Sequence, residues 1–171
     1  MNRLDGATAG LFVAWLAHDV EELATMRNTS RDILGSVPKW APLPDELRRD
    51  GLSQAHVNLA IAIMGAGLAA ASLDGWRSGG QGRLYQTCLH AFGLHGLSHI
   101  AGALVRRRYV TGVATAPVIV LPFWLFARRA LKANQVRDTH SRLWPVIFLA
   151  SGAVAHGLAH WATRRRPERN Q

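Results

Sequence analysis

Thiol groups are almost absent from this chain. Cys88 is its single cysteine in 171 residues, which excludes an internal disulfide bond and any metal cluster held by several thiolates. The chain also lacks internal repeats, low-complexity tracts and a phosphate-binding glycine loop, and no change in composition marks a second domain. The first apolar segment has no small-residue cleavage site after a charged leader, so we expect that segment to be retained. These absences predict one domain without a disulfide framework.

Acidic residues are also few. The chain has 11 Asp and Glu against 20 Lys and Arg, which gives a formal net charge of +9. A nucleic-acid-binding protein would gather such charge on one face of a folded module. Here the basic clusters instead follow apolar segments, at Arg106–Arg108, Arg128–Arg129 and Arg164–Arg166. We therefore predict no nucleic-acid partner and expect membrane lipids to surround the protein.

Apolar segments long enough to cross a bilayer, for which about 20 residues are needed in a helix, make up most of the chain. The sequence therefore predicts an all-α fold, a polytopic membrane bundle of about five transmembrane helices in which residues 1–171 form a single integral-membrane domain. The longest connector, residues 27–55, is expected to lie at the membrane interface with a short helix over residues 45–50. The predicted spans are residues 7–26, 56–73, 84–105, 109–127 and 143–163.

The basic residues also predict an orientation in the membrane. With five spans, 12 of the 20 Lys and Arg residues fall on the side of the carboxyl terminus and the remainder on the side of the amino terminus. Cytoplasmic loops carry the excess of basic residues in membrane proteins. The sequence thus predicts a multi-pass protein of the cell membrane with a cytoplasmic carboxyl terminus.

Ionisable side chains are costly within an apolar span and usually have a function there. The first span contains the run H-x-x-E-E, which places an imidazole and two carboxylates on one helix face. Two later spans each contain H-x-x-x-H, whose imidazoles lie one helical turn apart. All these side chains lie about 6 to 16 Å from the same basic end of their spans. The common depth predicts one buried polar site, formed by His18, Glu21, Glu22, His95, His99, His156 and His160.

Imidazole and carboxylate donors without thiolate suit Fe, Zn or Mn. We therefore expect the five histidines of this set to bind a divalent transition metal, in a mononuclear or a dinuclear site. One glutamate, Glu21 or Glu22, would be a ligand, and the other would be a ligand or a general base. His56, at the entrance of the second span, is a further candidate ligand. Tyr109 is expected to donate a hydrogen bond to the substrate.

Three other ionisable residues are not assigned to the metal. His90 lies about 140° around its helix from His95, so it is expected to pack or to hydrogen-bond elsewhere. His140 lies in a polar connector and is expected to be solvated. Asp19 points about 100° away from His18 and is expected to pair with an arginine or to support a ligand from outside the metal shell.

Such a site predicts an integral-membrane metalloenzyme that acts on a lipid or another apolar small molecule. Oxidative iron chemistry ranks slightly ahead of zinc-dependent hydrolysis, because so many histidines suit a dinuclear iron site. In a zinc hydrolase, a glutamate outside the metal shell would deprotonate a metal-bound water. Two non-enzymatic functions remain as alternatives. Two of the histidines could bind haem for electron transfer, which ranks below Fe or Zn alone, or the polar cluster could conduct protons or metal ions.

Three short motifs together resemble the HXXEE-domain membrane proteins. The first is His18, Glu21 and Glu22, and the second is an intramembrane histidine whose counterpart is His95 or His99. The third is Tyr109-Val110-Thr111-Gly112, which is similar to the family's Y-x-P-G with threonine in place of proline. The resemblance implies a multi-helix membrane fold with a polar centre, and it supplies no reaction.

Two other families share part of the pattern. Membrane fatty-acid desaturases and hydroxylases use H-x-x-x-H and H-x-x-H-H boxes around two irons, but they need more histidines than this chain offers. Membrane CAAX-type proteases carry EExxxR and FxxxH. Here Arg27 comes one position too late for the first element, and Phe92 is followed four residues on by Gly96. Chemistry analogous to that of the desaturases is therefore retained, and the protease interpretation ranks low.

Overall fold

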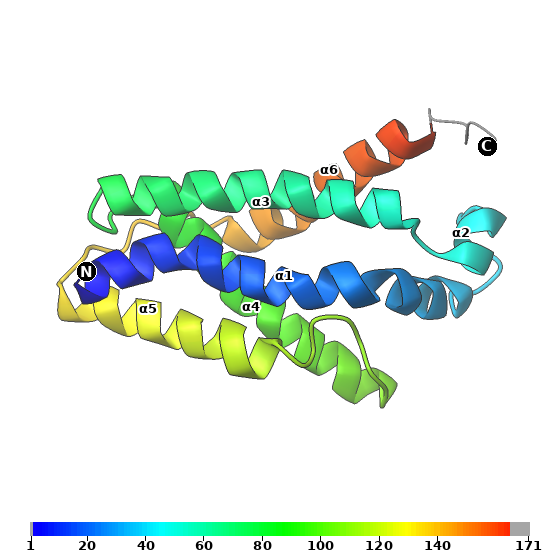
Figure 1. The fold of residues 1–171 in the computed structure, drawn as a ribbon, viewed down its shortest axis with the longest axis horizontal. Coiled ribbons are helices and arrows are strands. Elements are labelled where there is room, and N and C mark those ends of the chain that lie inside the picture. The colour runs from blue at the N-terminus through cyan, green and yellow to red at the C-terminus, as the bar shows by residue number, and fades with distance from the viewer. Residues whose placement is uncertain (1, 165–171) are drawn as a thin grey trace.

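The computed structural model describes residues 2–164, and within these residues the chain is all-helical and has no strand. The five long helices run up and down alternately, with α1 beside α3 and α5, and α4 behind them (Figure 1). The short helix α2 lies at the end of the bundle where α1 ends and α3 begins. The elements are α1 (Arg3–Gly35), α2 (Asp45–Asp50), α3 (Gln54–Arg77), α4 (Arg83–Arg106), the π-helix η1 (Ala116–Val120), α5 (Leu121–Ala133) and α6 (Trp144–Arg164).

Helix α1 is longer than the first predicted span. It begins at a capping box in which the Asn2 side chain accepts from the Asp5 backbone and the Asp5 side chain accepts from the Asn2 backbone. The predicted connector from residue 27 is helical as far as Gly35, because no glycine or proline interrupts residues 27–34. The extra turns carry α1 beyond the apolar segment. The predicted short helix over residues 45–50 is present as α2.

The fourth predicted span does not begin at Tyr109. Residues 107–115 form an irregular segment, in which Arg107 ends α4 in the left-handed conformation with φ 51° and Gly112 has φ 77°. The helical part starts at η1 and continues through α5 to Ala133, six residues past the predicted end. The irregular segment, named here the 107–115 loop, lies against α1 instead of extending a helix.

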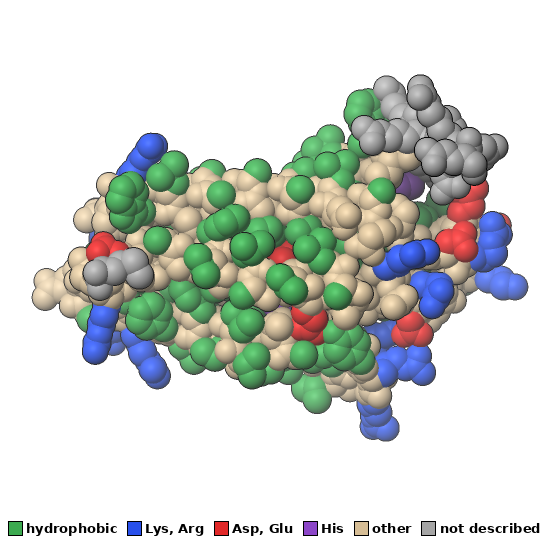
Figure 2. All heavy atoms as spheres, in the orientation of Figure 1, with side chains coloured by type: hydrophobic (Ala, Val, Ile, Leu, Met, Phe, Trp, Pro, Cys, Tyr) green, Lys and Arg blue, Asp and Glu red, His purple; other side chains and the backbone are tan. Residues whose placement is uncertain are grey.

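Among residues 2–164, three helices are long and apolar enough to cross a membrane: α3, α4 and α6. Helix α1 does not meet this criterion, because His18 lies among three carboxylates there, and α5 has only 13 residues. Figure 2 shows hydrophobic side chains over the middle of the molecule and Lys and Arg gathered at its two ends. This distribution is that of a membrane protein. Arg165, Arg166 and Arg169, on which the predicted orientation partly depends, lie outside the described residues.

The core joins α1 to α3 and α4 through close packing. A Cβ at Gly65 of α3 would lie 2.5 Å from the Trp15 ring of α1, so only glycine lets the two helices approach here. Tyr85 of α4 is fully buried and donates from its hydroxyl to the Ala7 carbonyl at 2.9 Å. These contacts fix the rotation of α1 and α4 about their axes. That rotation determines which ionisable side chains of the two helices face each other.

Candidate metal centre

Four ionisable side chains of α1 and α4 converge in the interior. Each helix contributes two residues four positions apart, which therefore lie on one face: His18 and Glu22 from α1, and His95 and His99 from α4. One ligand atom from each residue lies within 4.8 Å of the other three. His18 is fully buried, Glu22 is 4% exposed and His99 is 8% exposed, and His95 is partly buried. We name these four residues the histidine–glutamate cluster.

The distances within the histidine–glutamate cluster are close to those between ligands of one metal ion. The Glu22 Oε1 atom lies 3.1 Å from His99 Nε2, 3.7 Å from His95 Nε2 and 3.9 Å from His18 Nε2. The Nε2 atoms of His95 and His99 are 2.9 Å apart. Adjacent donors bound to one ion at about 2.0–2.2 Å lie about 2.8–3.6 Å from each other. Both His99 distances fall in this range, and the distances from Glu22 to His95 and His18 exceed it by a few tenths of an ångström.

Two atoms of the cluster are buried polar atoms without a hydrogen-bond partner, His18 Nε2 and Glu22 Oε1. Leaving such atoms unpaired in an apolar interior is costly, and native proteins rarely do so. Both atoms belong to the set that converges, and a cation held between the four residues would satisfy them. The residues present therefore fit a divalent metal ion.

The other glutamate of the run, Glu21, points to the 107–115 loop. Its Oε2 accepts from the Thr115 hydroxyl at 2.6 Å and from the Thr115 backbone at 2.8 Å. Its Oε1 accepts from the Ala114 backbone at 3.2 Å and from the Tyr109 hydroxyl. The structure thus separates the two carboxylates, with Glu22 in the cluster and Glu21 bound to the loop.

Thr115 links Glu21 to the histidine–glutamate cluster. The Thr115 hydroxyl lies 2.7 Å from His18 Nδ1 while it donates to Glu21. A hydroxyl that donates its one proton to the carboxylate accepts from its other neighbour, so Nδ1 of His18 carries the ring proton. The Nε2 atom then keeps a lone pair that faces the cluster. A carboxylate that orients a ligand histidine in this way is a frequent feature of metal sites.

Gly112 brings the loop backbone against two of the histidines. A Cβ at this position would lie 2.8 Å from His99 Cε1 and 2.9 Å from His18 Cε1, and its φ of 77° favours glycine independently. Thr111, which stands where the resembling family has proline, donates its backbone N–H to Thr29 Oγ1 at 3.2 Å. Proline has no N–H group, so threonine adds an anchor between the loop and α1.

The remaining predicted ligands form a second histidine group. His56 Nε2 of α3 lies 2.9 Å from His156 Nδ1 of α6, and the ring centroids of His56 and His160 are 6.1 Å apart. The structure therefore brings His56, His156 and His160 together, but it does not place them among the ligand atoms of the histidine–glutamate cluster. We name these three residues the three-histidine group.

A third group, at the opposite end of the bundle, contains His140, for which we expected solvation. Its ring centroid lies 4.4 Å from that of His90, and its Nδ1 hydrogen-bonds Asp138. Burial raises the pKa of Asp138 and the His140 hydrogen bond lowers it, and the net pKa lies below the usual range. The buried Gln86 holds this connector by accepting from the Thr139 backbone at 2.8 Å. The Asp138 side chain is 67% exposed, so this group lacks the burial of the histidine–glutamate cluster.

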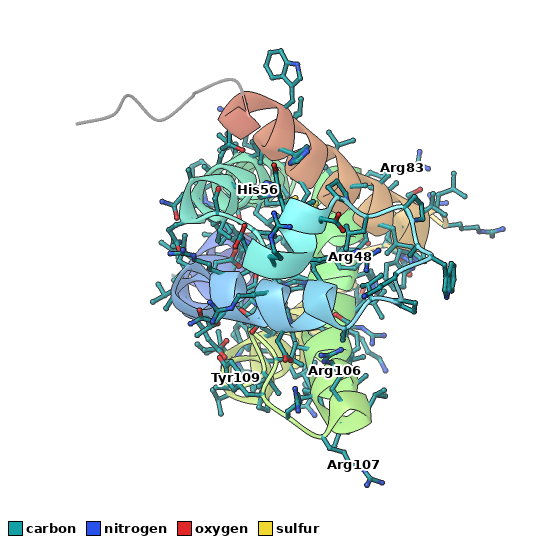
Figure 3. The ribbon with its side chains drawn as sticks, turned by 90° about the vertical axis from the view of Figure 1, so that its right-hand side faces the viewer. Arg48, His56, Arg83, Arg106, Arg107 and Tyr109 are labelled. Atoms are coloured by element: carbon teal, nitrogen blue, oxygen red, sulfur yellow. The ribbon has the colours of Figure 1, made fainter. Side chains whose placement is uncertain are left out.

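Asp19 also differs from expectation. It is 3% exposed, its Oδ1 has no hydrogen-bond partner, and no arginine among the described residues forms an ion pair with it. Two arginines, at the end of the bundle where α4 ends, pair with Asp32 instead. Arg106 and Arg108 each donate to Asp32 at 3.0 Å, and the hydrogen bond from Arg106 holds the pKa of Asp32 below its usual range. Figure 3 looks onto this end, with Arg106 near the end of α4.

Sequence reasoning placed Thr115 at the depth of the predicted site but assigned neither Thr115 nor Gly112 a role in it. Thr115 lies three residues after the Y-x-x-G element. A hydroxyl residue so close to that element is the sequence feature that could have indicated its role. Tyr109, predicted to contact the substrate, instead donates to Glu21. Its phenol helps to hold the 107–115 loop on α1.

The chain matches the protein family described as "Protein of unknown function with HXXEE motif" over residues 9–127. This range covers more than half of the chain, and the chain therefore belongs to that family. No curated protein and no solved structure matches it. All four residues of the histidine–glutamate cluster lie within the matched range, whereas His156 and His160 lie beyond it.

Proposed function

We propose that this HXXEE-family protein is an integral-membrane, iron-dependent enzyme that oxidises a lipid or another apolar metabolite. The observation that carries the proposal is the convergence of four donor atoms, two of them buried without a hydrogen-bond partner, in the histidine–glutamate cluster. A buried carboxylate among three imidazoles is costly unless a cation is shared between them. One divalent metal would be held by His18, Glu22, His95 and His99.

The number of donors favours iron over zinc. Four protein ligands would fill the tetrahedral shell that zinc prefers, and a catalytic zinc keeps one position open. An iron ion with the same four ligands keeps two positions of a six-coordinate shell for dioxygen and substrate. Bound iron would supply the redox chemistry with dioxygen. The separation of the three-histidine group from the cluster favours one metal over two.

The surrounding residues would position the ligands and hold the site closed. Thr115 and Glu21 orient the His18 ring with its Nε2 lone pair toward the cluster. Gly112 packs on the His18 and His99 rings, so the 107–115 loop excludes water from that side. Hydrogen bonds from Tyr109 and Thr115 to Glu21 keep the loop in place.

We also propose that α1 and the η1–α5 segment cross the membrane with the three apolar helices. Large apolar side chains on both are exposed, including Val13 at 64% and Val20 at 60% on α1, and Val118 at 68% on η1. Lipid contact would remove these side chains from water. The protein would then span the cell membrane five times, with the carboxyl terminus on the cytoplasmic side that carries more basic residues.

Metal analysis of the protein, purified without oxygen into lipid nanodiscs, tests the proposal. We expect about one iron per chain and an absorption spectrum without the Soret band of haem. Nitric oxide binds ferrous iron at an open position and gives a characteristic electron paramagnetic resonance signal, which we also expect. A matched pair of variants locates the site: His99→Ala is expected to lose the iron and His156→Ala to retain it.

Other outcomes would overturn parts of the proposal. One zinc per chain in place of iron would contradict oxidation and favour hydrolysis, with Glu22 acting as a general base. A Soret band would favour electron transfer by haem. A protein that copurifies with no metal and binds none on titration with Fe²⁺ and Zn²⁺ would contradict metal binding altogether.

A further inference from the structure

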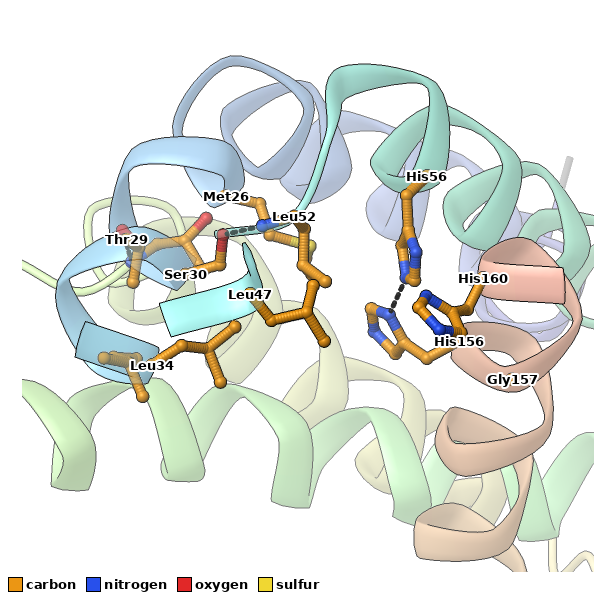
Figure 4. A pocket seen from close by; sticks show the side chains of 12 residues that line it. Met26, Thr29, Ser30, Leu34, Leu47, Leu52, His56, His156, Gly157 and His160 are labelled. Carbon is orange, nitrogen blue, oxygen red and sulfur yellow. Dashed lines mark hydrogen bonds between the residues drawn. The ribbon is translucent and has the colours of Figure 1, made fainter. Parts of the chain in front are cut away.

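A cavity of about 540 Å³ lies beside the three-histidine group. Its apolar side chains come from the carboxyl-terminal half of α1, from α2 and from the segment just before α3 (Figure 4). Thr29 and Ser30 of α1 also line it. A volume of this size is typical of pockets for small molecules. The apolar side chains are Met26, Ile33, Leu34, Leu47 and Leu52.

The opposite wall of the cavity is polar. It is formed by His56 of α3 with His156 and His160 of α6, and Figure 4 shows the rings of the three residues close together beside the apolar wall. The lining of the cavity is therefore mainly apolar, with a small polar patch at the imidazole nitrogens. A ligand that fills it needs the same two parts, an apolar chain and a polar head.

The hydrogen bond between His56 and His156 limits the kind of head that fits. His56 Nε2 and His156 Nδ1 lie 2.9 Å apart, so one of these nitrogens donates and the other accepts. A neutral imidazole has one donor and one acceptor nitrogen. Whichever ring donates, the two nitrogens left over are one donor and one acceptor. These two nitrogens lie on the outer edges of the hydrogen-bonded ring pair, so a ligand meets one of them at a time. A hydroxyl group, which both donates and accepts, can pair with either one without a charge.

The cavity also adjoins the histidine–glutamate cluster. Thr111 lines the cavity, and the next residue, Gly112, packs on the His18 and His99 rings. The 107–115 loop thus borders both the cavity and the histidine–glutamate cluster.

We propose that this cavity binds a long-chain alcohol, with its hydroxyl group at the three-histidine group and its hydrocarbon chain along the wall formed by Met26, Leu34, Leu47 and Leu52. That this alcohol is the substrate of the metal centre rests on the proposed function, whereas the binding of the alcohol in the cavity does not.

Photolabelling in nanodiscs tests this binding. The probe is a long-chain alcohol with a diazirine in the middle of its chain, and the labelled residues are identified by mass spectrometry. We expect labels on the apolar wall, displaced by excess hexadecanol and not by hexadecane. Leu47→Trp, which fills the cavity, is expected to abolish them, and Leu97→Trp, on an exposed face of α4, to leave them unchanged. His156→Phe keeps an aromatic ring without nitrogens and is expected to weaken labelling about tenfold.

The unmodified protein alone can overturn the proposal. Equal displacement by hexadecanol and hexadecane, or labels spread evenly over the exposed helix faces, would show that no alcohol site exists. Metal content measured on the same samples separates this result from the metal centre. Iron with unspecific labelling would refute the cavity alone, and specific labelling without any metal would refute the proposed function alone.

Discussion

Replacing Thr115 by valine tests how the site is held together. Valine keeps the shape of threonine but removes the hydroxyl that lies 2.7 Å from His18 Nδ1 and 2.6 Å from Glu21 Oε2. His18 is fully buried, so water cannot replace the lost partner. Loss of a group that orients a metal ligand costs about 10- to 100-fold in metal affinity. An unpaired buried group costs about 1–3 kcal/mol of stability in addition.

Metal affinity is measured by competition between the protein and a coloured chelator for Co²⁺, a spectroscopic substitute for iron, in nanodiscs. Thr115→Ser keeps the hydroxyl and is expected to bind within about threefold of the wild type, since its hydrogen bonds are retained. Thr87→Val removes a hydroxyl that accepts from the Ser141 backbone at 3.0 Å, far along α4, and should lower stability alone. Equal Co²⁺ affinities of wild type and Thr115→Val would refute the role of Thr115 in orienting His18. The same loss of Co²⁺ affinity in Thr87→Val as in Thr115→Val would also refute it.

Three other changes have defined outcomes. Gly112→Ala introduces a Cβ 2.8 Å from His99 at φ 77°, and is expected to cost about 1–3 kcal/mol in thermal unfolding and to weaken Co²⁺ binding. Asp32→Asn removes the ion pair with Arg106. The pKa of Asp32 in the folded protein is depressed, so the stabilisation by this ion pair is present above the ordinary carboxyl pKa of about 4. It is lost as the pH falls through the lower folded pKa. The difference in thermal unfolding midpoint between wild type and Asp32→Asn should therefore vanish in acid. In a cysteine-free background, Lys39→Cys should react with a membrane-impermeant maleimide added on the cytoplasmic side. Ser78→Cys should react when the maleimide is added on the other side. If both react from the same side, an odd number of membrane crossings between the two positions is refuted.

The chemistry of the cluster could be predicted from local spacing. His18 with Glu22 and His95 with His99 are pairs four residues apart, so each pair had to share a helix face. Counting residues along each span gave their common depth. Depth is only one coordinate, however, and His156 has the same depth on a helix that faces α3 instead of α1. The rotation of α6 depends on contacts between distant residues, which one sequence does not reveal.

The division of roles between Glu21 and Glu22 depends on a segment that was predicted as helix. Both carboxylates lie near the His18 row of α1, and their spacing cannot distinguish them. The 107–115 loop distinguishes them, because its backbone N–H groups at Ala114 and Thr115 bind Glu21. A helix beginning at Tyr109 would have left no such donors. This loop depends on the left-handed backbone of Arg107 and Gly112. Only the glycine indicated a left-handed residue in the sequence, because arginine rarely adopts this conformation.

The length of α1 also has a local cause that hydropathy conceals. The apolar segment ends near residue 26, but helix formation continues to Gly35 because nothing interrupts it earlier. The additional turns supply Ile33 and Leu34 to the cavity wall. Apolar segments thus indicate which parts of the chain suit a membrane interior, but they do not predict where its helices end.

Counting the imidazoles bound to the metal tests the central claim most directly. Extended X-ray absorption fine structure of the bound metal, measured in nanodiscs, counts imidazole ligands by the scattering from their more distant ring atoms. We predict three imidazole ligands in the wild type and in His156→Ala. In Glu22→Gln we predict the same three imidazoles and the loss of the carboxylate oxygen ligand. Fewer than three imidazoles in the wild type, or a loss of one in His156→Ala, would contradict a metal centre formed by His18, Glu22, His95 and His99.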